Sequence, residues 1–284
     1  MNSILDDLDT RPGSASSLLR TLVGASIRDL DGWMSSAAFV WLLGQLGVSP
    51  ARTRNALTRA KAKGLLRAEV RTAPGYALTE EGHALLARGD RRIFHPRLMD
   101  IRDPWCLISF SVPEADRDLR HQLRRRLTWI GCGVVADALW VCPEFLADEV
   151  SAIVRELGLG AHVVLFRAHV IYSPEDPAAD LGRWWDLPAI AALHEKFLAS
   201  HAAAIEEFST DPQPATAYRT WIAALDAWRP IPYLDPGLPA ELLPAGWPGN
   251  RSIPLFLQFR DNVVGLAATY VRSVTERESI GMTP

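Results

Sequence analysis

One block of residues in this sequence has a chemistry that suits an anionic polymer. Between Pro50 and Arg71 stand seven Lys or Arg residues and one acid, Glu69, a local net charge of +6 in a chain of net charge −3. The stretch from Ser173 to Asn250 is the opposite, with eleven acids and four bases. A basic block on an otherwise acidic chain is the electrostatic pattern that nucleic-acid binding requires; on charge alone, a solvated helix face is the alternative.

The residue types in this block match the groups that a DNA duplex presents. Arginine can donate to guanine O6 and N7 together, and asparagine can bridge N6 and N7 of adenine. Arg52, Asn55 and Arg59 are three and four residues apart, so on a helix they share one face, and we expect them at base edges. The other candidates are expected at the DNA backbone or, for the last two, the minor groove: Ser49, Thr58, Lys61, Lys63, Arg67 and Arg71.

Three helices with a tight connection must position these side chains. Apolar residues recur at helical spacing over 16–29, and residues 34–47 form a second such segment with Ser35 as its capping residue. Ser49-Pro50 combines a capping side chain with a proline at the first helical position, so a third helix is expected over 50–63. Two short helices joined by so tight a turn are typical of a helix-turn-helix. The residues of the third helix expected to face inward are Thr53, Leu57 and Ala60.

A hairpin and a fourth helix follow. Strands are predicted over 65–69 and 76–78, flanking a turn at 72–75 with Pro-Gly at its tip. Thr79 then begins another helix with a capping pattern. Three helices, a hairpin and a helix are the order of a winged helix-turn-helix domain.

The middle of the chain alternates strand and helix signals in the order β-α-β-β-α-β, which is typical of the ferredoxin-like fold. The predicted segments are strand 105–112, helix 117–130, strands 134–135 and 139–141, helix 145–157 and strand 162–171. After a linker at 173–177 the chain becomes helical and rich in tryptophan. Helices are expected over 189–208, 215–228 and 253–275, with an irregular proline-rich loop at 230–254.

The sequence predicts a multidomain α+β protein. The expected parts are a winged helix-turn-helix over 14–95, a ferredoxin-like domain over 100–173 and a helical C-terminal domain over 178–278. No apolar run approaches the roughly 20 residues of a membrane span, and the acidic start is unlike a signal peptide. We therefore expect a cytoplasmic protein with no membrane contact, in which the three cysteines are buried thiols.

Patterns that would support catalysis are weak. His162 and His169 stand seven residues apart, as do His194 and His201, but no carboxylate completes a metal-ligand pattern. No GxSxG, phosphate-binding loop or dinucleotide fingerprint is present. We expect a protein that is not an enzyme, without catalytic residues, metal or cofactor. A cluster of arginines at 117–126 is expected to pair with acids at a domain or dimer interface rather than to contact DNA.

Several sequence strings together resemble the PaaX family of bacterial regulators, named for the repressor of phenylacetate catabolism. The strings are VSPARTRNALTR at 48–59, KGLL at 63–66, RRRLTWIGCG at 124–133, LWVCP at 139–143, WWDL at 184–187 and LDPGLPAELLPAGWPG at 234–249. The resemblance covers the chain from about Ser14 to Val274. It implies a winged helix, a middle domain like the Cas2 ferredoxin fold and a helical C-terminal domain.

The resemblance also implies a function. The chain would be a homodimeric repressor on palindromic double-stranded operator DNA, released by an aryl-coenzyme A thioester such as phenylacetyl-CoA. Aromatic side chains for the aryl group and bases for the phosphates make the candidate effector residues Arg183, Trp184, Trp185, Trp228, Arg229 and Arg251, whereas large aromatics are more often core residues.

Two other functions are open to this sequence. A Cas2-like domain raises the alternative of a metal-dependent nuclease, but the predicted strand 105–112 contains no carboxylate to hold the cation, and Glu114 comes only after it. A non-catalytic scaffold that keeps the winged helix for dimerisation is the second alternative.

Overall fold

The computed structural model describes residues 11–169, 177–208 and 213–279, which form two compact units. The first unit contains the chain up to Phe94, Lys196–Pro230 and the chain from Ser252 onward. The second contains His95–Glu195 and Ile231–Arg251. The predicted winged helix lies mainly in the first unit, the predicted ferredoxin-like domain lies in the second, and the predicted C-terminal domain is divided between them. The domain boundaries at 14–95, 100–173 and 178–278 remain predictions. The predicted linker at 173–177 lies, except for its last residue, outside the described residues.

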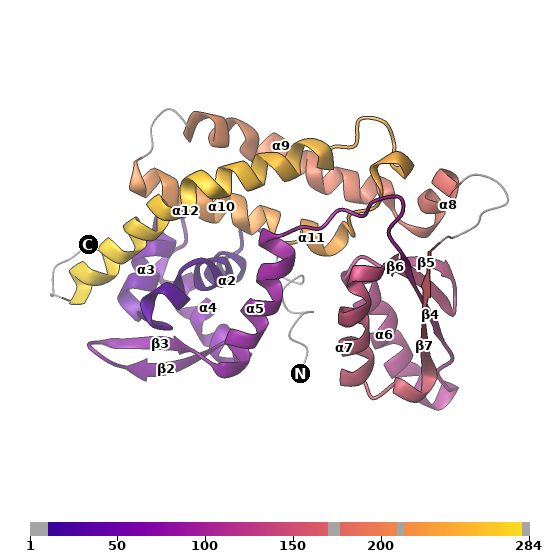
Figure 1. Cartoon of the computed structure of the whole chain (residues 1–284). Helices are drawn as coiled ribbons and strands as arrows, with labels where there is room; N and C mark the ends of the chain where they lie inside the picture. Colours follow the sequence, from indigo (N-terminus) through magenta and orange to yellow (C-terminus); the bar gives the residue numbers. More distant parts are fainter. Residues whose placement is uncertain (1–10, 170–176, 209–212, 280–284) are drawn as a thin grey trace. The chain divides into compact units, whose positions relative to one another are not determined.

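The first unit begins as a winged helix (Figure 1). Its helices are α2 (Ala15–Ser26), α3 (Ser36–Gly44), α4 (Pro50–Ala62) and α5 (Glu80–Phe94), with a 3-10 turn, η1, over Ile27–Leu30. Its antiparallel sheet has the order β1-β3-β2 and consists of β1 (Trp33–Ser35), β2 (Leu66–Val70) and β3 (Pro74–Leu78). The structure thus confirms the predicted order of helices and hairpin, and it adds the short strand β1.

Side-chain caps fix where these helices begin. Ser35 Oγ accepts a hydrogen bond of 2.9 Å from the backbone N–H of Ala38, and Thr79 Oγ1 accepts one of 2.9 Å from Gly82 N–H. Ser49 Oγ accepts from the N–H of Arg52 at 3.4 Å, and a proline follows at the first helical position of α4. Each cap satisfies a backbone donor that the first turn of a helix leaves unpaired, which is why these starts were predictable.

The hairpin differs from the prediction at its tip. Pro74 pairs with Val70, and Gly75 pairs with Glu69 in β2, so Pro-Gly is part of strand β3 and the turn lies at 71–73. Gly75 also pairs with Ser35 in β1, and a Cβ at Gly75 would lie 2.5 Å from the Met34 carbonyl oxygen. The glycine is therefore required by close packing in the middle strand, not by a turn.

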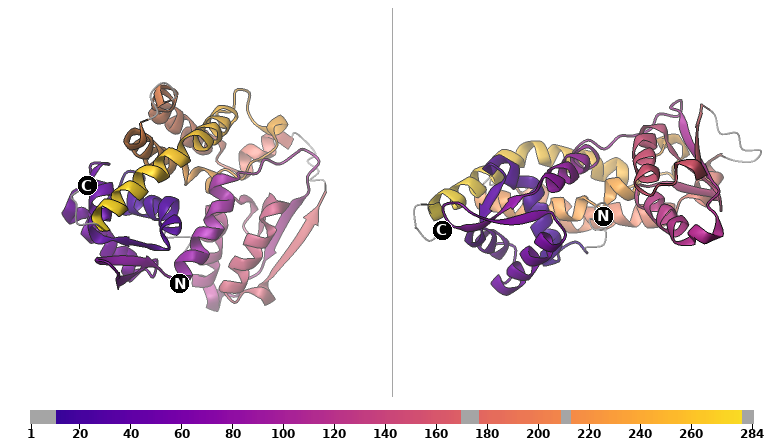
Figure 2. Two further views of the ribbon diagram at one scale, coloured as in Figure 1. Left: turned by 60° about the vertical axis from the view of Figure 1, so that its left-hand side comes forward. Right: turned by 90° about the horizontal axis from the view of Figure 1, so that it is seen from below.

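Helices from the C-terminal part of the chain pack on the winged helix in the same unit. They are the end of α9 (Leu187–Phe208), α10 (Pro214–Trp228) and most of α12 (Gly249–Ser279). Views from two further directions show α12, in yellow, alongside α10 (Figure 2). Trp228 of α10 stacks on Phe256 of α12 with ring centroids 4.4 Å apart, and the Tyr218 hydroxyl donates to the Leu42 carbonyl in α3 at 3.0 Å.

The second unit contains the predicted ferredoxin-like domain, and its element order is confirmed. The elements are β4 (Trp105–Phe110), η2 (Glu114–Asp116), α6 (Arg117–Trp129), β5 (Gly133–Ala136), β6 (Leu139–Pro143), η3 (Glu144–Leu146), α7 (Ala147–Glu156), η4 (Gly160–His162) and β7 (Val163–Ala168). The four strands form an antiparallel sheet of order β5-β6-β4-β7.

Both faces of this sheet carry packed side chains, but Val164 and Phe166 of β7 are 54% and 52% exposed on the face that also carries Trp105. Helices α6 and α7 bury Leu123, Leu127 and Val150 against one face. The other face packs Trp105 and Val141 into a cluster with residues from the later chain, which are Leu181, Trp185, Leu187, Ile190, Leu238 and Trp247. These residues come from α8 (Pro177–Trp184), the start of α9 and the segment that contains α11 (Ile231–Leu234) and η5 (Ala240–Leu242).

The proline-rich stretch at 230–254 is more regular than the sequence predicts. It contains α11 and η5, and α12 begins at Gly249, with Pro254 inside the helix rather than before it. Pro254 is the sixth residue of α12, so it lacks the N–H that would otherwise donate to the carbonyl of Asn250 in the helical ladder. No helix among the described residues is long and apolar enough to span a bilayer.

Candidate nucleic-acid interface

Helix α4 presents a buried apolar side and an exposed polar side. Thr53, Ala56 and Leu57 are buried, and Ala60 is half-buried. The prediction that Thr53 and Leu57 face inward is confirmed, Ala60 is half-buried on the same side, and Ala56 is buried in addition. Helix α2 packs against α4 from the side of these residues. The buried side therefore fixes the rotation of α4 about its axis, and with it the direction of every other side chain.

The rotation of α4 separates its polar residues into three rows. A helix turns by about 100° per residue, so Asn55 and Thr58 lie near the middle of the exposed side, opposite the buried residues. The remaining bases lie at the two edges of that side, with Arg52, Arg59 and Lys63 along one edge and Arg54 and Lys61 along the other.

The cationic groups of α4 point to solvent. Arg52, Arg54, Arg59 and Lys61 are exposed and form no ion pair with any residue that the structure describes. Arg59 Nη1 donates to Ser16 Oγ in α2 at 3.4 Å, which draws its guanidinium toward α2. Unneutralised cations on an exposed helix of a winged helix-turn-helix produce the positive surface that the phosphates of DNA attract.

Two polar candidates of α4 already serve the helix itself. Ser49 accepts the cap hydrogen bond from Arg52 N–H, and its hydroxyl proton remains free to reach a phosphate oxygen. The Thr58 hydroxyl donates to the carbonyl of Arg54 at 3.0 Å, so its proton is committed to the helix backbone. Ser49 therefore fits the predicted backbone contact better than Thr58 does.

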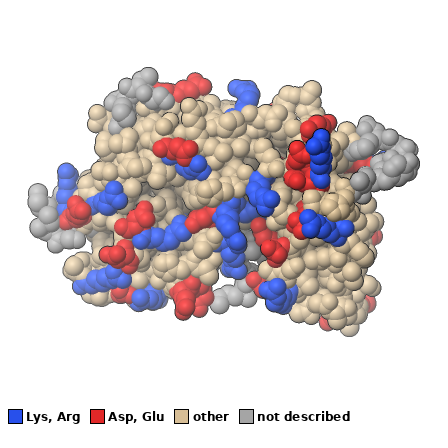
Figure 3. Space-filling view, in the orientation of Figure 1, with Lys and Arg blue, Asp and Glu red and all other residues tan. Residues whose placement is uncertain are grey.

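The hairpin arginines are neutralised in part by one acid. Glu69 forms ion pairs with Arg67 and with Arg71, and the hydrogen bond from Arg71 is the main cause that lowers the pKa of Glu69. Basic and acidic side chains stand side by side where Figure 1 draws β2 and β3 (Figure 3). Arg71 also lies over the Trp33 ring at 5.7 Å and donates to the Asp31 carbonyl at 3.4 Å. Arg71 thus helps to hold the wing, whereas Arg67, 58% exposed, is directed to solvent.

The candidate effector residues come from both units: Trp228 and Arg229 belong to the first, and the other four belong to the second. Trp228 is fully buried, and its Nε1 donates to the Ile93 carbonyl at 3.0 Å. Trp185 is 5% exposed and donates to the Gly131 carbonyl at 2.8 Å in the other unit, where a half-buried Trp184 packs beside it. Arg183 pairs with Asp180. Arg251 is exposed at the start of α12. Two of the three tryptophans are thus core residues with satisfied N–H groups.

Arg229 belongs to a buried polar cluster. Its Nη2 donates to Ser17 Oγ at 3.2 Å and lies 3.5 Å from a carboxylate oxygen of Asp226. Thr21 Oγ1 donates to the same carboxylate at 2.7 Å. The cluster joins α10 to α2, and nothing in the sequence pattern indicated it because its members are about two hundred residues apart.

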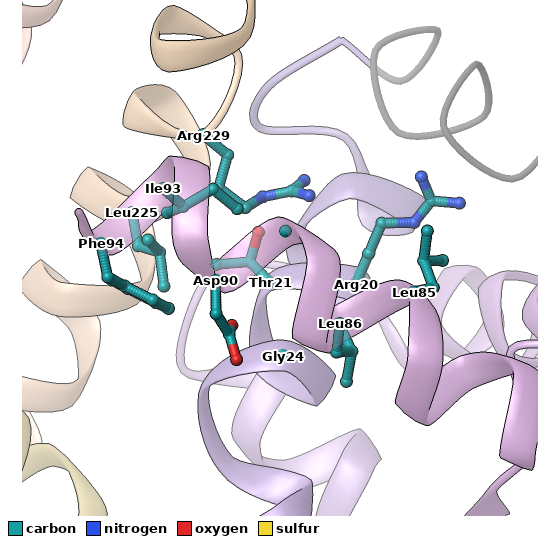
Figure 4. A pocket seen from close by; sticks show the side chains of 11 residues that line it. Arg20, Thr21, Gly24, Leu85, Leu86, Asp90, Ile93, Phe94, Leu225 and Arg229 are labelled. Atoms are coloured by element: carbon teal, nitrogen blue, oxygen red, sulfur yellow. The ribbon is translucent and has the colours of Figure 1, made fainter. Parts of the chain in front are cut away.

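A small cavity lies beside this cluster, between α2, α5 and α10 (Figure 4). The guanidinium groups of Arg20 and Arg229 lie on the same side of it, and its other walls include Leu86, Ile93 and Leu225. Its volume of about 30 Å³ is well below the roughly 150 Å³ of a cavity that holds one benzene molecule. A ligand as large as an aryl-coenzyme A thioester would enter only if the surrounding helices moved.

The arginines of α6 pair within their own domain. Arg120 binds Glu114 at 2.7 Å, and Arg126 binds Glu156 at 2.9 Å. Arg124 binds Asp137 at 3.0 Å, and Arg125 lies 4.6 Å over the Trp129 ring. The predicted pairing with acids is present, but the partners named here lie in the same unit and not across an interface.

The first acid after strand β4 is Glu114, and its carboxylate forms an ion pair with Arg120. His194 is buried and shares a hydrogen bond of 2.8 Å with Asp235, with the Trp247 ring at its edge. Among the described residues no three His, Cys, Asp or Glu side chains gather as metal ligands would.

The fold and the basic face of α4 define a winged helix-turn-helix protein with a ferredoxin-like middle domain and C-terminal helices. Three family models match the chain: the PaaX-like protein over residues 14–82, the central Cas2-like domain of PaaX protein over 99–179 and the PaaX-like protein C-terminal domain over 185–273. The chain belongs to the PaaX family.

Two individual proteins are similar over nearly the whole chain. The "Transcriptional repressor PaaX" of Escherichia coli (strain K12) is 26% identical over 281 residues, which are 96% of this chain and 87% of that protein. The solved structure of an uncharacterized protein from Mycobacterium tuberculosis is 25% identical and has a TM-score of 0.58. That similarity covers 93% of this chain and 99% of the other.

Proposed function

We propose that this protein is a DNA-binding transcriptional repressor that reads operator DNA with helix α4. The observation that carries the proposal is the exposed side of α4, where Arg52, Arg54, Arg59 and Lys61 form no ion pair with a described residue. A solvated face that served only solubility would be expected to alternate in sign, as the hairpin does with Arg67, Glu69 and Arg71. The printed name of the Escherichia coli relative supports the same function.

Different rows of α4 contact the bases and the phosphate backbone of the DNA. Asn55 lies near the middle of the exposed side, where a side chain enters the major groove most deeply, and Arg52 lies one turn away. Lys61 and Lys63 lie nearer the C-terminal end of the helix and suit backbone phosphates, as Ser49 does at the N-terminal end. Arg67 is the wing residue best placed for a flanking phosphate or the minor groove.

The finer parts of the proposal rest on family membership. We propose a cytoplasmic homodimer on palindromic DNA that controls aromatic-compound catabolism and is released by an aryl-coenzyme A thioester such as phenylacetyl-CoA. The accessible effector candidates are Arg183, Trp184 and Arg251, because Trp185 and Trp228 are buried. Arg229 would serve an effector only through a movement of α10, since it is tied to Asp226 and Ser17.

One experiment separates the candidate functions. The full chain is mixed with its own upstream DNA in a gel-shift assay, with and without a panel of aryl-coenzyme A thioesters. A shifted band that one thioester removes supports the repressor and identifies the effector. No shift at low salt contradicts DNA binding and favours a scaffold, and cleavage of the DNA that depends on a divalent metal favours a nuclease.

A further inference from the structure

Helix α3 ends in a way that leaves one buried carbonyl to a donor outside the helix. In a continuing α-helix the carbonyl of Leu42 would accept a hydrogen bond from the N–H of Leu46. That N–H donates to the carbonyl of Leu43 instead, at 3.0 Å. Leu42 is fully buried, and a buried carbonyl that is left without a partner costs free energy. The end of α3 therefore needs a donor from another part of the chain.

The end of α3 leads directly into the turn of the helix-turn-helix. Gly47 has a φ of 76°, in the left-handed region, and its N–H donates to the Gly44 carbonyl at 3.0 Å. The Val48 N–H donates to the Leu43 carbonyl at 3.1 Å, and Ser49 then caps α4. Because α4 begins directly after this turn, the hydrogen bonds at the end of α3 set the direction in which α4 starts.

The donor to the Leu42 carbonyl is the Tyr218 hydroxyl of α10, at a distance of 3.0 Å. Tyr218 is fully buried, and this burial raises the pKa of its phenol well above the ordinary value, with a further contribution from Tyr270. The hydroxyl therefore keeps its proton at neutral pH and remains a donor. Since a carbonyl oxygen only accepts, the hydrogen bond has a single direction, from α10 to α3.

Helix α10 is itself held in place further along its length. Asp226, about two turns after Tyr218, accepts hydrogen bonds from the hydroxyls of Ser17 and Thr21 in α2. Trp228 donates its Nε1–H to a backbone carbonyl of α5 at 3.0 Å. The Tyr218 hydroxyl therefore comes from a helix that is fixed to the winged helix at other points, and it gives the end of α3 a fixed partner.

We propose that Tyr218 is a positioning residue for DNA recognition, whose hydroxyl holds the last turn of α3 and thereby fixes the turn from which α4 starts. The inference rests on the proposed function and adds to it a buried residue that does not touch DNA. A displacement of α10 withdraws the donor from the Leu42 carbonyl. The Leu46 N–H is then expected to bond to that carbonyl, as in a continuing helix, and this exchange changes the turn and the direction of α4.

The test compares Tyr218→Phe with the matched control Tyr270→Phe, both in the full chain. The two rings have centroids 5.4 Å apart, and each variant removes one phenolic hydroxyl while it keeps the ring and the net charge. Affinities for a labelled upstream duplex and for an unrelated duplex of equal length are measured by fluorescence anisotropy at several salt concentrations. Hydrogen exchange of the backbone amides at 45–49 is followed in the free protein. All measurements are made well below the melting temperature of each variant, so that every sample is folded.

We expect Tyr218→Phe to weaken binding to the upstream duplex by about tenfold, the loss of roughly one base contact, and binding to the unrelated duplex by less than about twofold. The logarithmic salt dependence should stay the same, because no charge is removed. A role confined to stability would lower the melting temperature and leave both affinities unchanged, and that result would overturn the proposal. An equal effect of Tyr270→Phe would also overturn it, because the hydrogen bond to Leu42 would then not be the cause.

Hydrogen exchange separates this inference from the proposed function. If the unmodified protein binds neither duplex, the repressor proposal fails, but the exchange of the turn still tests the role of Tyr218. We expect the amides at 45–49 to exchange about tenfold faster in Tyr218→Phe and not in Tyr270→Phe, because a buried carbonyl that has lost its partner weakens the structure around it. Unchanged exchange at 45–49, or an equal acceleration throughout the first unit, contradicts a specific hold on the turn.

Discussion

The Ser17 hydroxyl donates a hydrogen bond of 2.6 Å to a carboxylate oxygen of Asp226, which joins the first helix of the winged helix to α10. Thr21 Oγ1 donates to the same oxygen at 2.7 Å, and the Gly13 N–H donates to the other oxygen at 2.6 Å. Asp226 is 1% exposed. A carboxylate so deeply buried is held by the donors around it, and these donors come from the DNA-binding part of the chain.

The variant Asp226→Asn tests whether this carboxylate stabilises the first unit. The amide keeps the shape but removes the charge. Its NH2 group would lie against the Gly13 N–H or the Arg229 guanidinium, and neither of these groups can accept a hydrogen bond. We expect a loss of about 3 kcal/mol in the free energy of unfolding, since donors to a buried charged group lose their partner. Urea denaturation followed by tryptophan fluorescence measures it, because Trp221 and Trp228 lie in the same helix.

The control for this variant is Glu276→Gln, an exposed acid on α12 of the same unit. It removes the same charge without touching a buried donor and should change the free energy of unfolding by less than about 0.5 kcal/mol. Equal urea midpoints for the two variants would show that the hydrogen bonds between Asp226 of α10 and Ser17 and Thr21 of α2 contribute little to stability.

Glu69 limits the positive charge of the wing. Because it pairs with both Arg67 and Arg71, Glu69→Gln leaves the hairpin with two unneutralised cations. We expect tighter binding to any duplex and a logarithmic salt slope steeper by up to about 0.9, the contribution of one more phosphate contact. The slope is measured by anisotropy on duplexes of unrelated sequence. A lower affinity would indicate that Glu69 matters more for the fold of the hairpin than for its charge.

The pH dependence of the wing follows from the same ion pairs. The pKa of Glu69 is lowered in the folded protein, first by the hydrogen bond from Arg71, so the folded state favours the ionised carboxylate. This stabilisation is complete above the ordinary carboxyl pKa and disappears as the pH falls through the lowered folded value. Trp33 donates its Nε1–H to the Glu69 carbonyl at 3.2 Å and reports on the hairpin through its fluorescence. The acid-induced change in that signal should be smaller in Glu69→Gln.

Asn55 and Lys61 should respond differently to DNA sequence. Asn55→Ala removes a side chain from the middle of the exposed side of α4, and we expect a loss of about 1–3 kcal/mol on the cognate duplex alone. Lys61→Ala removes a cation from the edge and should lower affinity on every duplex while it flattens the salt slope. Competition with unlabelled duplexes measures both. If both variants lost the same affinity for the cognate duplex relative to unrelated duplexes, Asn55 would not read bases and Lys61 would not contact only phosphates.

Local signals made most of the winged helix predictable. Caps such as Ser35 and Ser49 act within three residues of the helix start, so the sequence alone shows them. Strand β1 was missed because it has three residues and exists only through pairing with β3, some forty residues later. The predicted position of the hairpin turn was also wrong because of pairing between distant residues. Gly75 lies in the middle strand, between β1 and β2, and not in the turn.

In the candidate site, too, the features set by nearby residues could be predicted from the sequence, and those set by distant residues could not. The charge of α4 is visible in the sequence, and its exposure follows from the apolar residues on its other side. The neutralisation of Arg71 by Glu69 is also local, but the stacking of Arg71 on Trp33 depends on the sheet. The link between Asp226 and Ser17 spans 209 residues, and no periodicity or spacing rule connects such positions.

Gly133 offers a test of whether Trp185 is a structural residue. A Cβ at Gly133 would lie 2.6 Å from the Trp185 ring, which is anchored by its hydrogen bond to the Gly131 carbonyl, so Gly133→Ala forces the ring or strand β5 to move. We expect a loss of about 1–3 kcal/mol in the free energy of unfolding, the usual cost of overpacking a core. The matched control is Gly160→Ala, where a Cβ meets nothing within 4 Å. Urea denaturation compares the two, and equal midpoints would mean that Trp185 shifts freely and is available to a ligand.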